Sequence, residues 1–258
     1  MRIIGYVKAH PYGCAWILLL VIAGYIGYRA AAPVELEFVE LSSPKGFRAL
    51  VLNSKSSTFD PLQGLPWKEG EANSTTRPQE DLGGVCEMLL HDKASPIVGS
   101  RDGTVSVVEF FDYRCPYCKV LTEILSEVRA DGLIHVIYKE WPILGESSLL
   151  GARAALAAEK QGRYLEFHET LMKSRLIPTM GYIQNLSGKF DINHPQLLKD
   201  MSSEETSSAL RRNSALASQL GLGGTPVLVV GRTFVQGAVT QEQLERLISY
   251  ERSSAPVC

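Results

Sequence analysis

Metal-binding side chains are scarce in this sequence, which has five cysteines and five histidines among 258 residues. Three of the cysteines, Cys14, Cys86 and Cys258, stand alone, and no two histidines have an HxxxH-like spacing. A structural zinc site usually takes four Cys or His ligands in closely spaced pairs. The sequence therefore predicts no metal site.

Positive charge is also limited, since the net charge is −2 and the lysines and arginines form no basic run. This argues against a nucleic-acid surface. The chain has no internal repeat, no P-loop and no dinucleotide fingerprint, so we expect no cofactor. Hydrophobic residues make up 45% of the chain, enough for a core in one or two domains.

The most informative motif that is present is Cys-Pro-Tyr-Cys at residues 115–118. It stands between a predicted strand, residues 105–111, and a predicted helix, residues 119–129. Unpaired N–H groups at the start of a helix favour an anion, so they stabilise a thiolate at Cys115. Cys118 follows one helical turn later, close enough to form a disulfide with Cys115.

Two simpler interpretations of this motif remain open. The pair can be half of a zinc site, although no second pair of ligands is found, or it can be an inert structural disulfide. Pro116 falls in the first helical turn, where its missing N–H costs nothing, so the motif suits a helix start. We favour a redox-active pair.

The N-terminus predicts a membrane anchor over residues 11–32. From Tyr12 to Ala32 the chain carries one charge, Arg29, and it has about the twenty residues that a membrane-spanning helix needs. Basic residues precede this segment and acidic residues follow it, which places residues 1–10 in the cytoplasm and the rest outside. Cys14 would then lie in the membrane segment.

A cleaved signal peptide is the alternative, because Ala30-Ala31-Ala32 offers small residues for a cleavage site. Arg29 and Pro33 fit poorly around such a site, so we favour the uncleaved anchor. Either interpretation places the cysteine motif in an oxidising compartment.

The remainder divides into a linker or accessory segment, residues 33–80, and a folded domain, residues 81–258. Residues 35–41 and 47–52 have some strand character, but residues 53–79 are rich in turn-forming residues and lack periodicity. The folded domain starts with a strand–helix–strand unit whose second strand is residues 133–138, and we expect these strands to be parallel. Further helices are predicted at residues 85–90, 147–160, 164–173, 180–190, in pieces over 195–220, and after Thr240, with strands at 226–230 and 233–236.

This order resembles the thioredoxin fold with an inserted helical subdomain, about residues 146–220, as in DsbA-like thiol-disulfide oxidoreductases. The resemblance depends on three passages: residues 107–118, which end in the cysteine motif, residues 138–142 (Tyr-Lys-Glu-Trp-Pro), and residues 224–231, which begin Gly-Thr-Pro. It implies an α/β fold for residues 81–258, preceded here by the predicted transmembrane helix.

The resemblance also implies roles for single residues. Cys115 corresponds to the exposed attacking cysteine and Cys118 to its buried partner. Thr225-Pro226 corresponds to the loop with a cis proline beside the cysteines, and together with Pro116 and Tyr117 it is expected to contact substrate. Glu109 corresponds to a buried acid that exchanges a proton with Cys118, and the alternative is a solvent-facing strand residue.

Lys139 and the two remaining cysteines have weaker expectations. Lys139 can pair with Glu109 or simply be a surface lysine. Cys86 and Cys258 can form a structural disulfide that ties the C-terminus to the helix before the first strand. Alternatively, one is a buried thiol and the other a mobile terminal thiol.

The expected function is thiol-disulfide exchange on unfolded or assembling secreted proteins. The resemblance implies a bacterial inner-membrane protein with its catalytic domain in the periplasm, recharged by a membrane redox partner. Tyr117 replaces the histidine of the strongest oxidases, and Thr225 is similar to the residue in isomerases and in ScsC-like and DsbG-like proteins. We therefore expect isomerase or dual activity, and residues 33–80 as a possible oligomerisation segment. The alternative function is a copper-binding or chaperone module without turnover.

Overall fold

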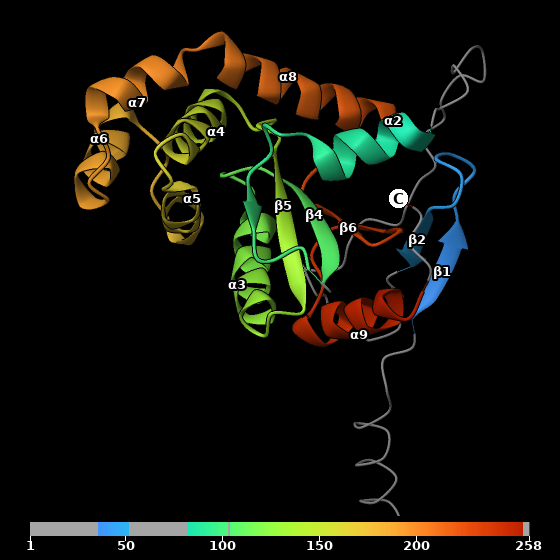
Figure 1. Ribbon diagram of the computed structural model, residues 1–258. Coiled ribbons are helices and arrows are strands. Elements are labelled where there is room, and N and C mark those ends of the chain that lie inside the picture. Colours follow the sequence, from blue (N-terminus) through green and yellow to red (C-terminus); the bar gives the residue numbers. More distant parts are fainter. Residues whose placement is uncertain (1–35, 52–81, 103, 255–257) are drawn as a thin grey trace, which may run out of the picture. The chain divides into compact units, whose positions relative to one another are not determined.

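A mixed sheet forms the centre of the computed structural model, which describes residues 36–51, 82–102, 104–254 and 258 (Figure 1). The described residues place seven strands in the order β1-β2-β7-β6-β4-β5-β3. The strands are β1 (Glu37–Glu40), β2 (Arg48–Val51), β3 (Ile97–Val98), β4 (Val105–Phe111), β5 (Ile134–Glu140), β6 (Val227–Val230) and β7 (Thr233–Gln236).

The helices cover both faces of this sheet. Before the central strands come α2 (Leu82–Cys86) and the π-helix η1 (Glu87–His91), and α3 (Pro116–Ala130) joins β4 to β5. The last helix, α9 (Gln241–Arg252), follows β7. Between β5 and β6 the chain forms α4 (Glu146–Glu159), α5 (Tyr164–Lys173), α6 (Met180–Lys189), α7 (His194–Met201) and α8 (Glu204–Gln219).

The predicted strand–helix–strand unit is confirmed. β4 and β5 pair in parallel along their whole length, from Val105↔Ile134 to Phe111↔Glu140. Nearly every residue of the two strands is buried, because helices cover both faces. This explains their nearly continuous apolar sequences.

Side chains of β4 alternate between two hydrophobic cores. Val107 packs with Leu121 of α3 on one face of the sheet, whereas Val108 packs with Val85 of α2 and Leu216 of α8 on the other. Residues two apart in β4 or β5 therefore share a face, and adjacent residues do not. This alternation decides which polar side chains can reach the cysteine motif.

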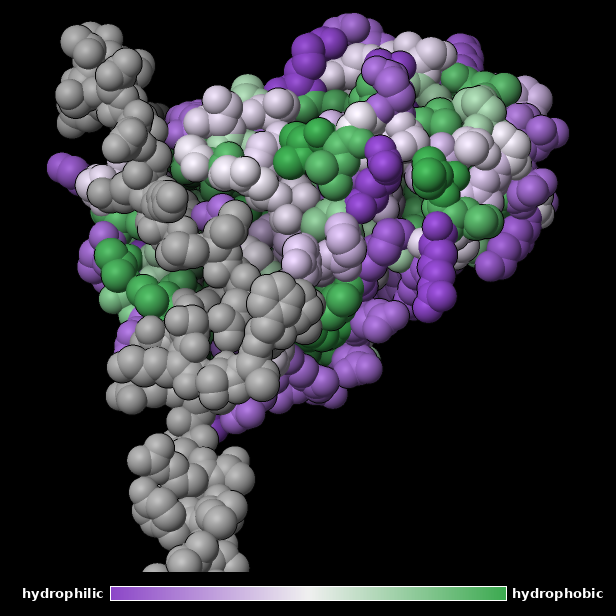
Figure 2. Space-filling view, turned by 180° about the vertical axis from the view of Figure 1, so that it is seen from behind, coloured by the Kyte–Doolittle hydropathy of each residue, from purple (hydrophilic) through white to green (hydrophobic). Residues whose placement is uncertain are grey.

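The helices of the insertion lie where the sequence predicted them. The predicted helix over residues 164–173 is α5, and the residues expected to be helical in pieces divide into α7 and α8. Thr240 forms the predicted capping box with Gln243 at the start of α9. In Figure 2 apolar side chains reach the surface in separate patches between polar ones, and the exposed large apolar residues of the insertion include Leu176, Ile177 and Met180.

Residues 36–51, which the sequence analysis assigned to a linker or accessory segment, belong to the sheet. β2 pairs in parallel with β7, and β1 pairs antiparallel with β2. The Arg48 guanidinium lies over the rings of Phe38 and Tyr250, at 4.2 and 4.4 Å from their centroids. It also forms a buried ion pair with Glu251 of α9. The folded unit therefore starts at Leu36, well before residue 81.

The predicted membrane segment, residues 11–32, and Cys14 lie outside the described residues. Within those residues, no helix combines the length and the apolar character required to cross a bilayer.

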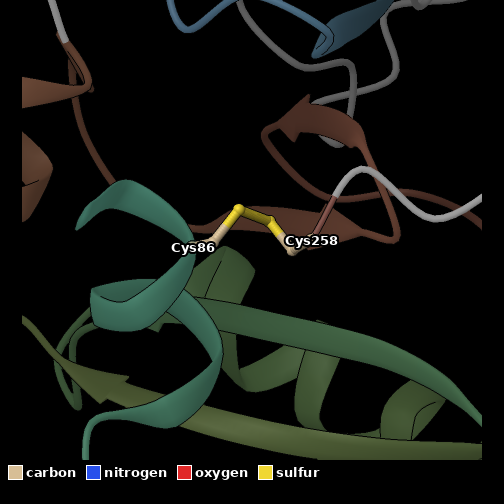
Figure 3. The surroundings of a disulfide bond; sticks show 2 residues. All are labelled: Cys86 and Cys258. Carbon is tan, nitrogen blue, oxygen red and sulfur yellow. A yellow bond between two sulfur atoms is a disulfide. The ribbon is translucent and has the colours of Figure 1, made fainter. Parts of the chain in front are cut away.

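A disulfide joins Cys86 of α2 to Cys258, with an S–S distance of 2.03 Å (Figure 3). The two cysteines are 172 residues apart in the sequence. The bond ties the C-terminal residue to the helix before the first central strand, as the first alternative expected.

We expect the substitution Cys258→Ser to lower the free energy of unfolding by about 2–4 kcal/mol, because the long closed loop no longer restricts the unfolded chain. Urea unfolding of the wild type and of the variant, with and without reductant, measures this. A reductant should destabilise the wild type more than Cys258→Ser, because the Cys115–Cys118 pair responds in both proteins and the Cys86–Cys258 bond only in the wild type. An equal response of both proteins would contradict a stabilising role.

Candidate active site

Cys115 lies where the chain passes from β4 into α3. It is the N-cap residue of α3, and Pro116 occupies the first helical turn. The Cys115 sulfur accepts a hydrogen bond from the Cys118 backbone N–H at 3.3 Å. It also lies 3.3 Å from the carbonyl oxygen of Thr225, to which the thiol donates. A helix terminus and a loop distant in sequence thus converge on one sulfur atom.

Cys115 was expected to be exposed, and this was wrong for the residue as a whole, which is 3% exposed. The Thr225 loop lies against the sulfur and accounts for part of this cover. Tyr117, the other residue between the cysteines, is 38% exposed and marks the motif at the surface.

The surroundings lower the pKa of Cys115 to about 6. Hydrogen bonding with Cys118 is the largest cause, and hydrogen bonds from the side chain of Thr225 and from the backbone of Cys118 and Tyr117 also lower the pKa, against the effect of burial. Cys115 is therefore mostly thiolate at pH 7. The thiolate is the nucleophilic form of cysteine.

Cys118 has the opposite character. It is fully buried, and burial raises its pKa well above the ordinary cysteine value, with Cys115 and Glu109 adding to the rise. One sulfur of the pair is thus an anion at neutral pH and the other a neutral thiol, and both are free cysteines. This asymmetry suits a nucleophile with a reserve thiol beside it.

Glu109 lies in β4 on the same face as the cysteine motif and is fully buried, so it is not a solvent-facing residue. Neither carboxylate oxygen has a hydrogen-bond partner among the described residues. Burial, and secondarily the negative Cys115, raise the pKa of Glu109 to about 8. The acid is therefore mostly protonated at pH 7 and can give a proton close to Cys118, whereas only its ionised fraction can take one.

Lys139 neither pairs with Glu109 nor lies on the surface, and both expectations were wrong. It is fully buried, and its ammonium group donates to the Met88 carbonyl oxygen and, at 2.8 Å, to Ser95 Oγ. In the β4–β5 register the residue opposite Glu109 is Tyr138. Lys139, one residue further, therefore points to the other face of the sheet.

The predicted cis peptide bond between Thr225 and Pro226 is present. The next residue, Val227, pairs with Phe110 of β4. This antiparallel pairing holds the Thr225-Pro226 loop at the end of β4 from which the cysteine motif follows.

Asp112 was not identified from the sequence. Its buried carboxylate accepts hydrogen bonds from Ser148 Oγ at 2.7 Å and from the backbone N–H groups of Ile143 and Leu144 at 2.8 and 2.9 Å. Its carbonyl oxygen accepts the Cys115 N–H at 3.1 Å. Asp112 thus joins the motif to the loop after β5. Its position directly after an apolar strand was the available signal.

Comparison with known proteins decides the family. Residues 106–249 match the DsbA-like thioredoxin domain. The chain belongs to the DsbA-like thioredoxin family. By this membership it is a thiol-disulfide oxidoreductase with a thioredoxin-like fold and a helical insertion.

Individual relatives of this DsbA-like protein agree. Disulfide bond formation protein D of Bacillus subtilis is 26% identical over 172 residues, which cover 62% of this chain and 78% of the Bacillus protein. A thioredoxin-like oxidoreductase from Silicibacter pomeroyi is 39% identical with a TM-score of 0.62, covering 66% of this chain and 98% of that one. The catalytic domain of Proteus mirabilis ScsC is 30% identical with a TM-score of 0.61, covering 67% and 97%.

The part of the DsbA-like protein that the structure describes contains no group of three or more His, Cys, Asp or Glu side chains arranged to hold a metal ion.

Proposed function

We propose that this protein exchanges disulfides in unfolded or assembling secreted proteins, with Cys115 as the attacking and leaving sulfur. The observation that carries the proposal is the asymmetry of the cysteine pair: the pKa of Cys115 is lowered to about 6, whereas that of Cys118 is raised well above normal. Exchange requires a thiolate that attacks or leaves easily and a second sulfur that resolves the mixed disulfide.

In the oxidising direction, a substrate thiolate attacks Cys115 of the Cys115–Cys118 disulfide. The S–S bond breaks, and Cys118 leaves and takes up the proton held by Glu109. A second substrate thiolate then attacks the substrate sulfur of the mixed disulfide. The substrate disulfide forms, and Cys115 leaves as the stabilised thiolate, so that the enzyme pair is reduced by two electrons.

In the isomerising direction, the Cys115 thiolate attacks a wrong substrate disulfide and releases one substrate thiolate. That thiolate, or another in the same substrate, then attacks the mixed disulfide and regenerates Cys115. If none does so, Cys118 attacks instead, after the ionised form of Glu109 accepts its proton. The Thr225-Pro226 loop, Pro116 and Tyr117 flank the sulfur and are the proposed contacts for substrate.

We favour isomerase or dual activity over a purely oxidising role. Tyr117 supplies no positive charge beside Cys115, so the disulfide form is a weaker oxidant than in Pro-His enzymes. Thr225, the residue before the cis proline, is similar to the residue found there in isomerases, and this supports the same choice. The relatives named disulfide bond formation protein D and ScsC keep both directions open.

Location and partners extend this proposal. The predicted anchor at residues 11–32 would hold the domain on the outer side of a bacterial inner membrane, in the periplasm, with a membrane redox partner to recharge Cys115 and Cys118. The Cys86–Cys258 disulfide supports an oxidising compartment. Self-association through residues 33–80 remains part of the proposal, although residues 36–51 of that segment pair within the sheet.

Two assays on the protein test the function. The equilibrium potential of the Cys115–Cys118 pair against glutathione gives its direction, and reactivation of a scrambled disulfide protein measures isomerisation. We expect both oxidation of reduced substrate and rescue of scrambled substrate. Failure in both assays would reject exchange. Stoichiometric copper(I) binding with no turnover would instead support the binding module.

A further inference from the structure

Four buried polar side chains that the exchange mechanism does not use lie beside the active site. Tyr113 precedes Cys115 by two residues, Glu140 ends β5, and Tyr164 and His168 belong to α5 of the helical insertion. Each is at most 3% exposed. The buried polar cluster formed by these four residues thus joins the loop that carries Cys115 to the inserted helices.

One carboxylate oxygen organises the buried polar cluster. Glu140 Oε1 accepts the hydroxyl of Tyr113 at 2.8 Å and the hydroxyl of Tyr164 at 3.0 Å. The Tyr113 hydroxyl also lies 3.2 Å from His168 Nδ1. The Tyr113 hydroxyl has one proton, which it donates to Glu140. In the contact with His168, the donor is therefore His168 Nδ1–H. A chain of hydrogen bonds therefore runs from His168 through Tyr113 to Glu140.

Glu140 lacks a cation in this position. The ion pairs of the described residues do not include it, and the acids Asp112 and Glu109 act to raise its pKa further. Its Oε2 atom has no hydrogen-bond partner among the described residues. A neutral carboxylic acid fits this environment, since its carbonyl oxygen accepts two hydroxyls without a buried negative charge. Burial, the largest cause, raises the pKa of Glu140 well above its ordinary value.

We propose that Glu140 acts as a neutral carboxylic acid that positions Cys115, by holding Tyr113 and with it the loop that carries the cysteine. The backbone connection is short, because Cys115 N–H donates to Asp112, the residue before Tyr113. The insertion supports Glu140 a second time, through Asn213 of α8, which donates to the Glu140 carbonyl oxygen at 3.1 Å. This proposal rests on the proposed exchange function of Cys115.

Two tyrosines provide a matched pair for the test. Tyr113→Phe and Tyr164→Phe each remove one buried hydrogen bond to the same Glu140 oxygen, but only Tyr113 lies on the loop that carries Cys115. The readout is the thiolate absorbance and the alkylation rate of Cys115 against pH, in the whole protein. We expect Tyr164→Phe to lose about 2–5 °C of Tm, and Tyr113→Phe to lose somewhat more because His168 Nδ1–H also loses its acceptor.

The two variants should differ in the pKa of Cys115. We expect Tyr113→Phe to raise the pKa of Cys115, so that alkylation at pH 5 falls by about three- to tenfold. Tyr164→Phe should leave the titration within about 0.2 unit of the wild type, because its effect stays within the helical insertion. Equal titrations of Cys115 in the wild type and in Tyr113→Phe would overturn the proposal.

The charge of Glu140 is tested by substitution. Glu140→Gln keeps a neutral group with a carbonyl acceptor and should retain the wild-type titration of Cys115, whereas Glu140→Leu should shift it at least as far as Tyr113→Phe. A shift as large in Glu140→Gln would reject the neutral acid. If Glu140→Leu does not fold, Tyr113→Phe and Glu140→Gln still decide. These readouts use no protein substrate, so a failure of the proposed exchange function is scored separately.

Discussion

Replacing Cys115 by serine is expected to lower thiol-disulfide exchange at least about 100-fold at pH 7, because Cys118 is the only active-site thiol left. The pKa of Cys118 is raised well above normal, so Cys118 is a neutral thiol at pH 7, and it is fully buried. The measurement is the initial rate at which each reduced protein attacks a disulfide-bonded peptide and releases a thiol. Retention of more than a tenth of the wild-type rate would show that Cys115 is not the attacking sulfur.

The companion substitution Cys118→Ala should have a different consequence. Cys115 can still attack, but no neighbouring sulfur can displace the captured substrate, so mixed disulfides should accumulate. Non-reducing gel electrophoresis after incubation with a reduced, unfolded substrate and an oxidant measures them. The control is Cys115→Ser, which should form none. A protein that only carries metal would lose metal in both variants and form adducts in neither.

Replacing Glu109 by glutamine is expected to change how stability depends on pH. The folded pKa of Glu109, about 8, lies above the ordinary value of 4.5, so the folded protein binds this proton more tightly than the unfolded chain does. Stability contributed by the protonated acid is present below pH 4.5 and is lost as the pH rises through 8.

The variant has no acid at this position, so its unfolding free energy should not show this loss. Relative to the wild type, Glu109→Gln should gain about 3 kcal/mol between pH 4 and 7, and about 5 kcal/mol between pH 4 and 9. Urea unfolding of both reduced proteins across this range measures the difference. The amide itself adds an offset that is independent of pH, so only the change with pH matters. A constant difference would contradict the raised pKa.

The Glu109→Gln variant also tests the role of Glu109 in proton transfer, separately from its effect on stability. Glutamine cannot accept the Cys118 proton, so the release of a mixed disulfide by Cys118 should slow, while alkylation of Cys115 keeps its pH midpoint within about half a unit. Stopped-flow measurement of mixed-disulfide decay reports the first step and iodoacetamide titration the second. Unchanged decay would remove Glu109 from the proton transfer.

The sequence predicted the parts of the site that depend on local pattern. The strand before Cys115 and the helix after it, the cis Thr225–Pro226 bond and the helical insertion are all signalled by residues close together in the chain. Glu109 was identified by its spacing from Cys115. The pairing of Cys86 with Cys258 was one of two open alternatives.

Other features depend on register or on distant contacts. Lys139 was misplaced because β5 is buried on both faces, so its pattern does not reveal which residues share a face with Glu109. The pairing of Glu109 with Tyr138 decides this, and it is visible only in the sheet. Strands β1 and β2 are four residues each, too short to distinguish from a linker.

The hydrogen bonds of Glu140 with Tyr113 and Tyr164 also could not be predicted from the sequence. The three residues come from a loop, a strand end and a helix, and no local spacing relates them. Glu140 in an apolar, buried strand is the signal that remains, because a carboxyl group there needs partners from elsewhere.

The central claim is that Cys115 is an anion at neutral pH while Cys118 is not, and titration of the reduced protein tests it directly. Thiolate absorbance followed from pH 3 to 10, with Cys115→Ser as the blank, should show a midpoint near 6 that belongs to Cys115. A midpoint at or above 9.0, the value of an ordinary cysteine, would contradict the account.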